Sequence, residues 1–293
     1  MTRRSLFRPI LSTLSLLLLA GCTSLSLAVV NIPTWFGAFT VTKDVVFDPE
    51  TGMALDIYQP PKPADGAGHP VIVFFYGGSW REGDKADYRF VAAALASEGF
   101  LVILPNYRKS PTHPYPAFME DAANATRFAH DQASSYGGDP ARLFLMGHSA
   151  GAHIAALLGI ERQWLDAVGM TRQQIAGVVG LSGPYDLTPR ADDIRQVFDG
   201  APEHATHLSR LVDQATPPML LQYGLADEVV GPQNHERLAA ALREKDICHR
   251  VETYDGLGHA DLVSAFSWVY RSRRPVMDDT LAFLRDTGDC PRV

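Results

Sequence analysis

"LFLMGHSAGAHIAALL", residues 143–158, is the stretch of this sequence that decides the fold. Its apolar start, residues 143–146, is typical of a strand buried on both faces, and residues 150–159 favour a helix. Between them Ser149 stands in a Gly-x-Ser-x-Gly pattern, where small neighbours allow a sharp strand-to-helix turn. Such a turn exposes the serine hydroxyl above the sheet, so Ser149 is the candidate nucleophile.

Strand and helix patterns alternate along most of the chain. After a predicted hairpin over 41–60, strands are predicted at 71–76, 100–108, 142–147, 175–183, 218–224 and 249–256, and helices at 88–99, 117–137, 150–159, 231–246 and 261–286, the last with a break at Pro275. This alternation predicts one domain, residues 41–293, on a mostly parallel α/β sheet with right-handed crossovers. Residues 185–215 break the alternation and are predicted to form a small cap or lid.

The first 21 residues have the pattern of a secretory signal peptide, with three arginines before the leucine-rich run Ile10–Ala20. Leu19-Ala20-Gly21-Cys22 resembles the lipobox of bacterial lipoproteins. This resemblance implies that Cys22 is lipidated, that residues 22–40 are a tether, and that the protein is anchored at the periplasmic face of the outer membrane. The alternative is an uncleaved transmembrane anchor over 10–30, which is long enough but diluted by polar residues.

The other two cysteines, Cys248 and Cys290, form an even pair in a compartment expected to be oxidising. We expect a disulfide between them that pins the C-terminal tail. The alternative is a pair of free thiols. The sequence contains neither a His-Glu-x-x-His nor a Cys-x-x-Cys pattern, so it indicates no metal site.

Ser149 needs partners, because a serine hydroxyl is a weak nucleophile without a base. In hydrolases with this turn the chain order is serine, acid, histidine. Asp227 follows the strand predicted at 218–224, and His259 lies in a glycine-rich loop after the next strand. Both therefore fall at the carboxyl edge of the sheet, where Ser149 lies and where ligands bind in open α/β sheets. Glu228, beside Asp227, is the rival acid.

Three further polar residues near this edge are expected to have structural roles. His148 neighbours the serine and is expected to point elsewhere. His153 lies on the following helix, where packing is its expected role. Asp186 follows a strand in "SGPYDL" and is expected to cap or brace its loop.

A glycine pair after the strand 71–76 is the candidate oxyanion hole. The segment Tyr76-Gly77-Gly78-Ser79-Trp80 follows that strand directly. Backbone N–H groups of Gly77 and Gly78, together with that of Ala150, can face a tetrahedral oxyanion. Each such donor stabilises a transition state by about 3–4 kcal/mol.

Together these segments resemble the α/β-hydrolase superfamily, in particular its esterase branch with a His-Gly-Gly-x-Trp motif. The likeness points especially to prenylcysteine methylesterases, which carry a Tyr-Gly-Gly-x-Trp variant. It rests on residues 76–80, Asn106-Tyr107-Arg108, residues 136–158, Asp227 and His259, within a resemblance that spans residues 42–285. It implies an eight-stranded sheet with helices on both faces, and it assigns the roles of nucleophile, base, orienting acid and oxyanion donors to Ser149, His259, Asp227, and Gly77, Gly78 and Ala150.

Two departures limit what this resemblance carries over. Tyr76 replaces the commoner histidine of the motif, so the hydrogen bonds that brace the loop must differ. Prenylated proteins are not expected in a bacterial envelope, so the substrate of those methylesterases does not transfer.

These observations predict a serine carboxylesterase that cleaves short or medium acyl esters through an acyl-enzyme and needs no cofactor. The alternatives are an amidase or arylformamidase, and a non-catalytic binding lipoprotein on a hydrolase fold. The net charge of −7 argues against a nucleic-acid partner. The oligomeric state is not readable from the sequence.

Overall fold

The computed structural model describes residues 38–62, 67–271 and 275–286. The predicted signal peptide, Cys22, most of the tether and Cys290 lie outside these residues. Within the described ranges, none of the helices has the length and apolar character needed to cross a membrane.

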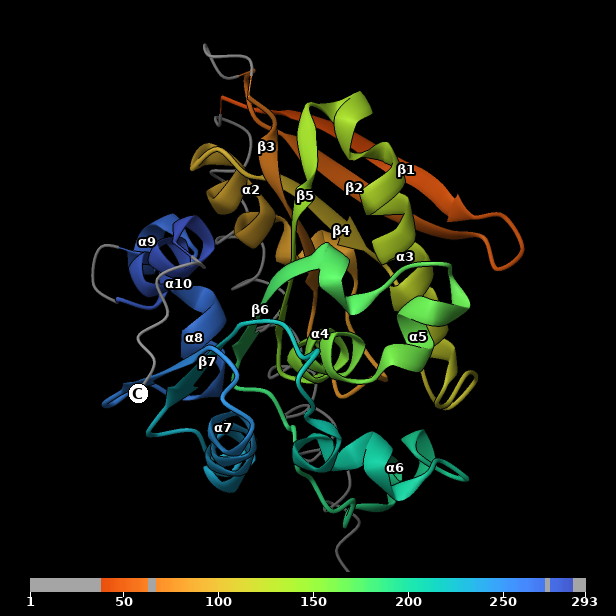
Figure 1. The fold of residues 1–293 in the computed structure, drawn as a ribbon, viewed down its shortest axis with the longest axis vertical. Helices are drawn as coiled ribbons and strands as arrows, with labels where there is room; N and C mark the ends of the chain where they lie inside the picture. Colours follow the sequence, from red (N-terminus) through yellow and green to blue (C-terminus); the bar gives the residue numbers. More distant parts are fainter. Residues whose placement is uncertain (1–37, 63–66, 272–274, 287–293) are drawn as a thin grey trace, which may run out of the picture.

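One twisted sheet forms the centre of the molecule (Figure 1). In the described part of the chain it has eight strands: β1 (Thr40–Asp48), β2 (Met53–Gln59), β3 (His69–Phe75), β4 (Leu101–Pro105), β5 (Gly138–His148), β6 (Ile175–Leu181), β7 (Met219–Gly224) and β8 (His249–Tyr254). Their order is β1-β2-β4-β3-β5-β6-β7-β8. Strand β2 pairs antiparallel with β1 and β4, and all later neighbours pair in parallel. The predicted mostly parallel sheet, with its N-terminal hairpin, is confirmed.

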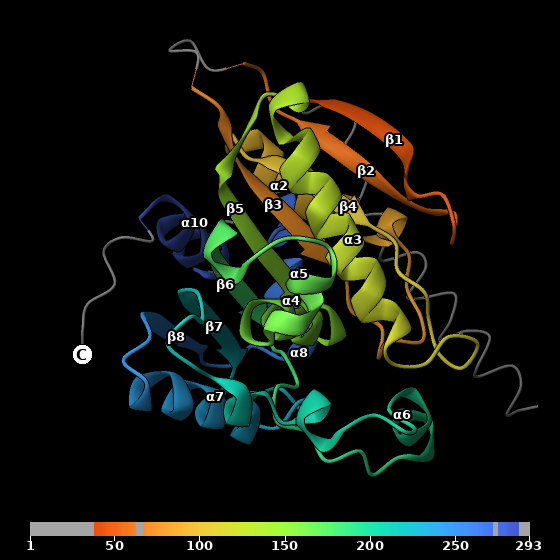
Figure 2. The same cartoon turned by 45° about the vertical axis from the view of Figure 1, so that its right-hand side comes forward.

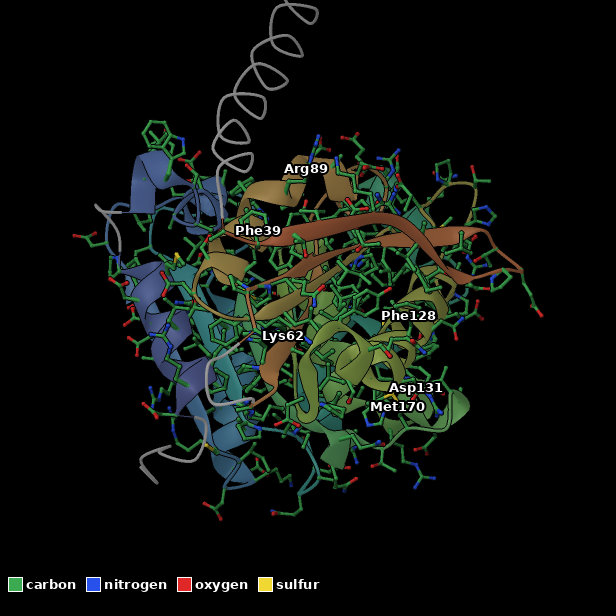
Figure 3. The ribbon with its side chains drawn as sticks, turned by 90° about the horizontal axis from the view of Figure 1, so that it is seen from above. Phe39, Lys62, Arg89, Phe128, Asp131 and Met170 are labelled. Carbon is green, nitrogen blue, oxygen red and sulfur yellow. The ribbon has the colours of Figure 1, made fainter. Side chains whose placement is uncertain are left out.

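Helices cover both faces of this sheet. The α-helices of the described residues are α2 (Arg89–Ser97), α3 (Ala117–Gln132), α4 (Ala150–Ile160), α5 (Arg162–Ala167), α6 (Asp192–Val197), α7 (Gln233–Glu244), α8 (His259–Ser264), α9 (Trp268–Arg271) and α10 (Val276–Arg285). Figures 1 and 2 show α2 and α10 on one side and α3, α4 and α5 on the other. From above, Arg89 at the start of α2 lies well apart from Phe128 and Asp131 of α3 (Figure 3).

The central strands are buried because helices cover both of their faces. Every residue of β4 and β7 is buried, as are all but one of β3. This explains why these strands read in the sequence as continuous apolar runs instead of alternating patterns. Strand β1 at the edge of the sheet is mostly exposed. Its partner β2 has buried residues in its middle and partly buried residues at both ends.

Two segments differ from the predicted elements. The helical run predicted at 261–286 is three helices, α8, α9 and α10, with an additional break at residues 265–267 before the predicted one at Pro275. Helix α5 is not predicted, because six residues are too short for a periodic apolar pattern to stand out.

Residues 185–215, here called the cap, fold as short pieces beyond the carboxyl edge of the sheet, with α6 outermost (Figure 2). That this segment acts as a cap or lid over the site stays a prediction. The segment has a small buried centre that includes Val197 and Phe198. Asp186 anchors its base, because its buried carboxylate accepts hydrogen bonds from the amide and the hydroxyl of Ser209 at 3.1 and 2.5 Å. The prediction that Asp186 braces its loop is confirmed.

Candidate active site

Ser149 occupies a strained turn between β5 and α4. Its φ of 55° and ψ of −124° lie outside the regions that ordinary residues prefer. The two flanking glycines make this turn possible: a Cβ on Gly147 would collide with the carbonyl of Gly151, and one on Gly151 with the carbonyl of Phe75. The amide of Ser149 donates to Leu181 O at 2.9 Å, which ties the turn to β6. The serine is thereby presented at the carboxyl edge of the sheet, as predicted.

Asp227 and His259 are joined by a hydrogen bond of 2.8 Å between Oδ2 and Nδ1. The Asp227 side chain is fully buried, whereas the His259 side chain is 15% exposed. Burial by itself would raise the pKa of Asp227, but hydrogen bonds from the Val230 amide, His259 and the Val229 amide leave this pKa lowered. Asp227 is therefore held as a carboxylate that faces the imidazole.

Glu228, the rival acid, is exposed at the surface beside this pair. The loops that carry Asp227 and His259 are also tied together by their backbones. Leu225 donates to Tyr254 O, and Ala226 donates to Leu257 O, each at 2.9 Å. These bonds hold the loop that carries His259 against the loop that carries Asp227.

His148 differs from its prediction. Instead of pointing away, its ring lies 4.8 Å from the ring of His259, at 44°. Its Nε2 lies 3.1 Å from the backbone oxygen of His259. Since His148 directly precedes Ser149, this contact brings His259 to the turn that holds the serine. A single sequence holds no signal for it, because it joins segments more than a hundred residues apart.

The glycine loop after β3 packs against the same turn. A Cβ on Gly77 would lie 3.0 Å from Ser149 Cβ, so a larger residue here would crowd the serine turn. Gly78 has a φ of +128°, and its carbonyl accepts the amides of Arg81 and Glu82, both at 2.9 Å. The loop thus folds back on itself directly beside Ser149.

The three predicted oxyanion donors all lie around the serine turn. Gly77 packs against Ser149, Gly78 follows it in the same loop, and Ala150 begins α4 directly after the serine. The role of their backbone N–H groups as oxyanion donors stays a prediction.

Tyr76 is braced by a network that replaces the usual histidine. Its hydroxyl donates to Asn106 Oδ1 at 2.9 Å and accepts from Lys109 Nζ at 3.0 Å. Its backbone oxygen accepts the Tyr107 hydroxyl at 2.9 Å, and the two rings stack with centroids 4.5 Å apart. Burial lowers the pKa of Lys109, against the pull of nearby carboxylates. Asn106 and Tyr107 belong to the sequence motif, whereas the role of Lys109 emerges only from the structure.

Trp80 connects the glycine loop to the cap. Its ring meets Phe198 of the cap and His153 of α4 edge-on, with centroids 4.9 and 5.1 Å away. His153 is fully buried, and its Nε2 lies 2.7 Å from Ala205 O. The prediction that His153 serves packing is confirmed, with the cap as its partner.

Across the residues that the structure describes, no three or more His, Cys, Asp or Glu side chains gather closely enough to hold a metal ion. Cys248 lies directly before β8, while Cys290 is outside the described residues, so their disulfide stays a prediction.

Curated relatives share much of this chain. The probable isoprenylcysteine alpha-carbonyl methylesterase ICMEL2 of Arabidopsis thaliana is 28% identical over 251 residues, which cover 78% of this chain and 59% of that protein. Esterase LipQ of Mycobacterium tuberculosis is 28% identical over 212 residues, covering 65% of this chain and 49% of that protein. The chain thus spans about three-fifths or less of the length of these relatives.

A solved structure and a family model also match this chain. An esterase from Thermogutta terrifontis, Est2, superposes with a TM-score of 0.70 at 22% identity, covering 87% of this chain and 94% of that one. This likeness establishes the α/β-hydrolase fold. The BD-FAE family model matches residues 55–242, which include the glycine loop, the Ser149 turn and Asp227. The chain belongs to the BD-FAE family.

Proposed function

We propose that this protein is a serine carboxylesterase that hydrolyses short and medium acyl esters. The observation that carries the proposal is the 2.8 Å contact of His259 Nδ1 with Asp227, made beside the strained turn of Ser149. Relatives named as esterases, such as Esterase LipQ, support ester bonds as the class of substrate.

The tautomer of His259 makes it suitable as a general base. A carboxylate only accepts hydrogen bonds, so the proton between His259 and Asp227 resides on Nδ1. Nε2 then keeps its lone pair and takes the proton of the Ser149 hydroxyl as Oγ attacks the ester carbonyl. The buried Asp227 orients the ring and stabilises the imidazolium that forms.

The remaining steps follow from the same groups. The tetrahedral oxyanion is stabilised by the N–H groups of Gly77, Gly78 and Ala150, and by the positive end of α4. The imidazolium gives its proton to the departing alkoxide, which leaves an acyl group on Ser149 Oγ. A water molecule deprotonated by His259 then attacks this acyl-enzyme, and the acid is released as the proton returns to Oγ.

A labelling and substrate experiment tests the proposal. A fluorophosphonate probe should label the wild-type protein at Ser149 and leave Ser149→Ala unlabelled. In a matched panel, p-nitrophenyl esters should be turned over well above aryl amides and N-formyl compounds. Preference for the N-formyl compounds would instead indicate a formamidase, and failure to label, beside a control esterase that labels, would indicate a binding protein.

We further propose that the mature protein is a lipoprotein of the bacterial envelope, anchored through Cys22. Radiolabelled palmitate should be incorporated by cells that express the full chain and not by cells that express Cys22→Ala. Incorporation into both would contradict this anchor.

The proposed disulfide between Cys248 and Cys290 rests on their even number in an oxidising compartment. Thiol titration of the denatured, unreduced protein should then find no free thiol at these two positions. Two titratable thiols there would contradict the bridge.

A further inference from the structure

His148 lies between three parts of the site. It contacts His259 and the glycine loop, and it is covalently joined to Ser149. It directly precedes Ser149 in the chain. Its Nε2 lies 3.1 Å from the backbone oxygen of His259, and the two rings pack at 4.8 Å. On the other side, a Cβ on Gly77 would lie only 3.1 Å from its Nδ1. The imidazole therefore fills the space between the nucleophile turn, the histidine loop and the glycine loop.

The chemistry of this ring is fixed by its surroundings. A backbone oxygen only accepts hydrogen bonds, so Nε2 of His148 carries the proton. Nδ1 is buried without a hydrogen-bond partner among the described residues. Burial, followed by the neighbouring His259, lowers the pKa of His148 to about 3, although its bond to the His259 carbonyl and the charge of Asp227 oppose this. His148 is thus a neutral donor with one tautomer throughout the working pH range.

Two hydrogen bonds also restrain the backbone of the loop that His148 contacts. Ala226 donates to Leu257 O, and Gly258 donates to the Asp261 carboxylate, each at 2.9 Å. Neither of these bonds is made by His259 itself. Asp227 holds the imidazole of His259 through Nδ1, and His148 adds a contact to the backbone oxygen of the same residue and packs against its ring.

We propose that His148 is a positioning residue, whose Nε2–H holds the backbone of His259 so that the catalytic imidazole faces Ser149. This inference rests on the proposed function, because it assumes that His259 is the base for Ser149. It extends that function by assigning a neutral histidine, placed between the catalytic elements, to the alignment of the base.

Variants of His148 separate the donor from the space that it fills. Glutamine reaches the position of Nε2 and carries an N–H there, whereas asparagine places its amide near Nδ1, and leucine fills space without a donor. His69→Leu is the matched control, because His69 is another buried histidine with two backbone oxygens in contact, Gly99 O at 2.8 Å and Pro61 O at 3.0 Å. It lies at the start of β3, the opposite end of the strand from the glycine loop.

Three quantities are measured for each variant: kcat and KM for a p-nitrophenyl ester, the rate constant of inactivation by a fluorophosphonate, and the urea midpoint. We expect His148→Asn and His148→Leu to lower kcat and the inactivation rate roughly 10- to 100-fold, with KM nearly unchanged, because a misplaced base slows proton transfer. His148→Gln should remain within about threefold of the wild type. His69→Leu should lower the urea midpoint without lowering kcat.

The outcomes distinguish a failure of the positioning role from a failure of the proposed function. If the wild type is labelled at Ser149 and His148→Asn reacts as fast as His148→Gln, the positioning role is overturned while the proposed function stands. If the wild type is not labelled, both fail. If the variants do not fold, nitrogen NMR of histidine-labelled wild type decides: His148 neutral and protonated at Nε2 from pH 5 to 8 supports the role, whereas a charged ring or the other tautomer overturns it.

Discussion

The carboxyl edge of the sheet and the cap of residues 185–215 hold their side chains in different ways. At the edge, the fully buried Asp227 accepts three hydrogen bonds. At the rim of the cap, the ion pair of Asp193 with Arg81 beside the glycine loop joins side chains that are 49% and 31% exposed. The acid at the edge is therefore held by several hydrogen bonds to a buried carboxylate, while the outer cap is held by a weaker, solvated contact. Substitutions at the edge should affect kcat, and those at the rim of the cap should not.

The largest effect is expected at the nucleophile. Ser149→Ala should lower kcat by about 10⁶-fold, because no other hydroxyl can occupy the strained turn. Its circular dichroism and urea unfolding should match the wild type, since only one oxygen is removed. A variant that keeps near wild-type turnover of a p-nitrophenyl ester would place the chemistry outside this edge.

The next largest effect is expected at the orienting acid. Asp227→Asn should lower kcat by about 10⁴-fold, because the amide imposes the wrong tautomer on His259. Glu228→Gln is the matched control, because this side chain is exposed. Equal losses in kcat from both variants would refute the assignment of Asp227.

The glycine loop should show an intermediate effect. Gly78→Ala should lower kcat by about 10²- to 10³-fold, because the new methyl group would collide with the carbonyl of Glu82 and displace an oxyanion donor. Gly52→Ala is a suitable control: its φ is also positive, at +71°, but the turn has open space and lies in the β1–β2 hairpin. A comparable loss of kcat in this control would show that backbone strain alone is responsible.

A smaller effect concerns stability and pH. The folded-state pKa of Asp227 is lowered, so its carboxylate stabilises the fold above the ordinary aspartate pKa. This contribution is lost as the pH falls through the lowered folded value. The difference in unfolding free energy between wild type and Asp227→Asn, measured with urea, should therefore shrink from pH 5 towards pH 2. A difference that grows over this interval would mean that Asp227 is protonated in the folded protein.

The smallest effect is expected at the rim of the cap. Asp193→Asn should change the unfolding free energy by less than about 1 kcal/mol, because its partner Arg81 lies in a partly exposed, screened pair. Values of kcat for short esters should stay close to those of the wild type. A large loss of kcat would show that the rim of the cap also contributes to catalysis.

Much of the edge is predictable because its determinants are local. The apolar run before Ser149 and the glycines around it specify a buried strand and a tight turn without reference to the rest of the chain. Chain order then places Asp227 and His259 at the same edge, since the ends of parallel strands meet there. The cap is predictable only as an interruption, because its short pieces lack a repeating pattern.

The long-range contacts within the site could not be predicted from the sequence. The ring contact between His148 and His259, and the brace that Lys109 supplies to Tyr76, join segments separated by 33 to 111 residues. Their geometry depends on how whole strands pack, and no local pattern reports it.

By itself, then, the sequence determined the strands, the serine turn, and the identity of the acid and the histidine. These features follow from the spacing of apolar residues, from glycine at sharp turns and from chain order, all of which act over short stretches or through topology. Only the tertiary structure decided which side chains hold the base and how the cap meets the glycine loop. These depend on a few tenths of an ångström between distant segments, a precision that arises only when the whole core is packed.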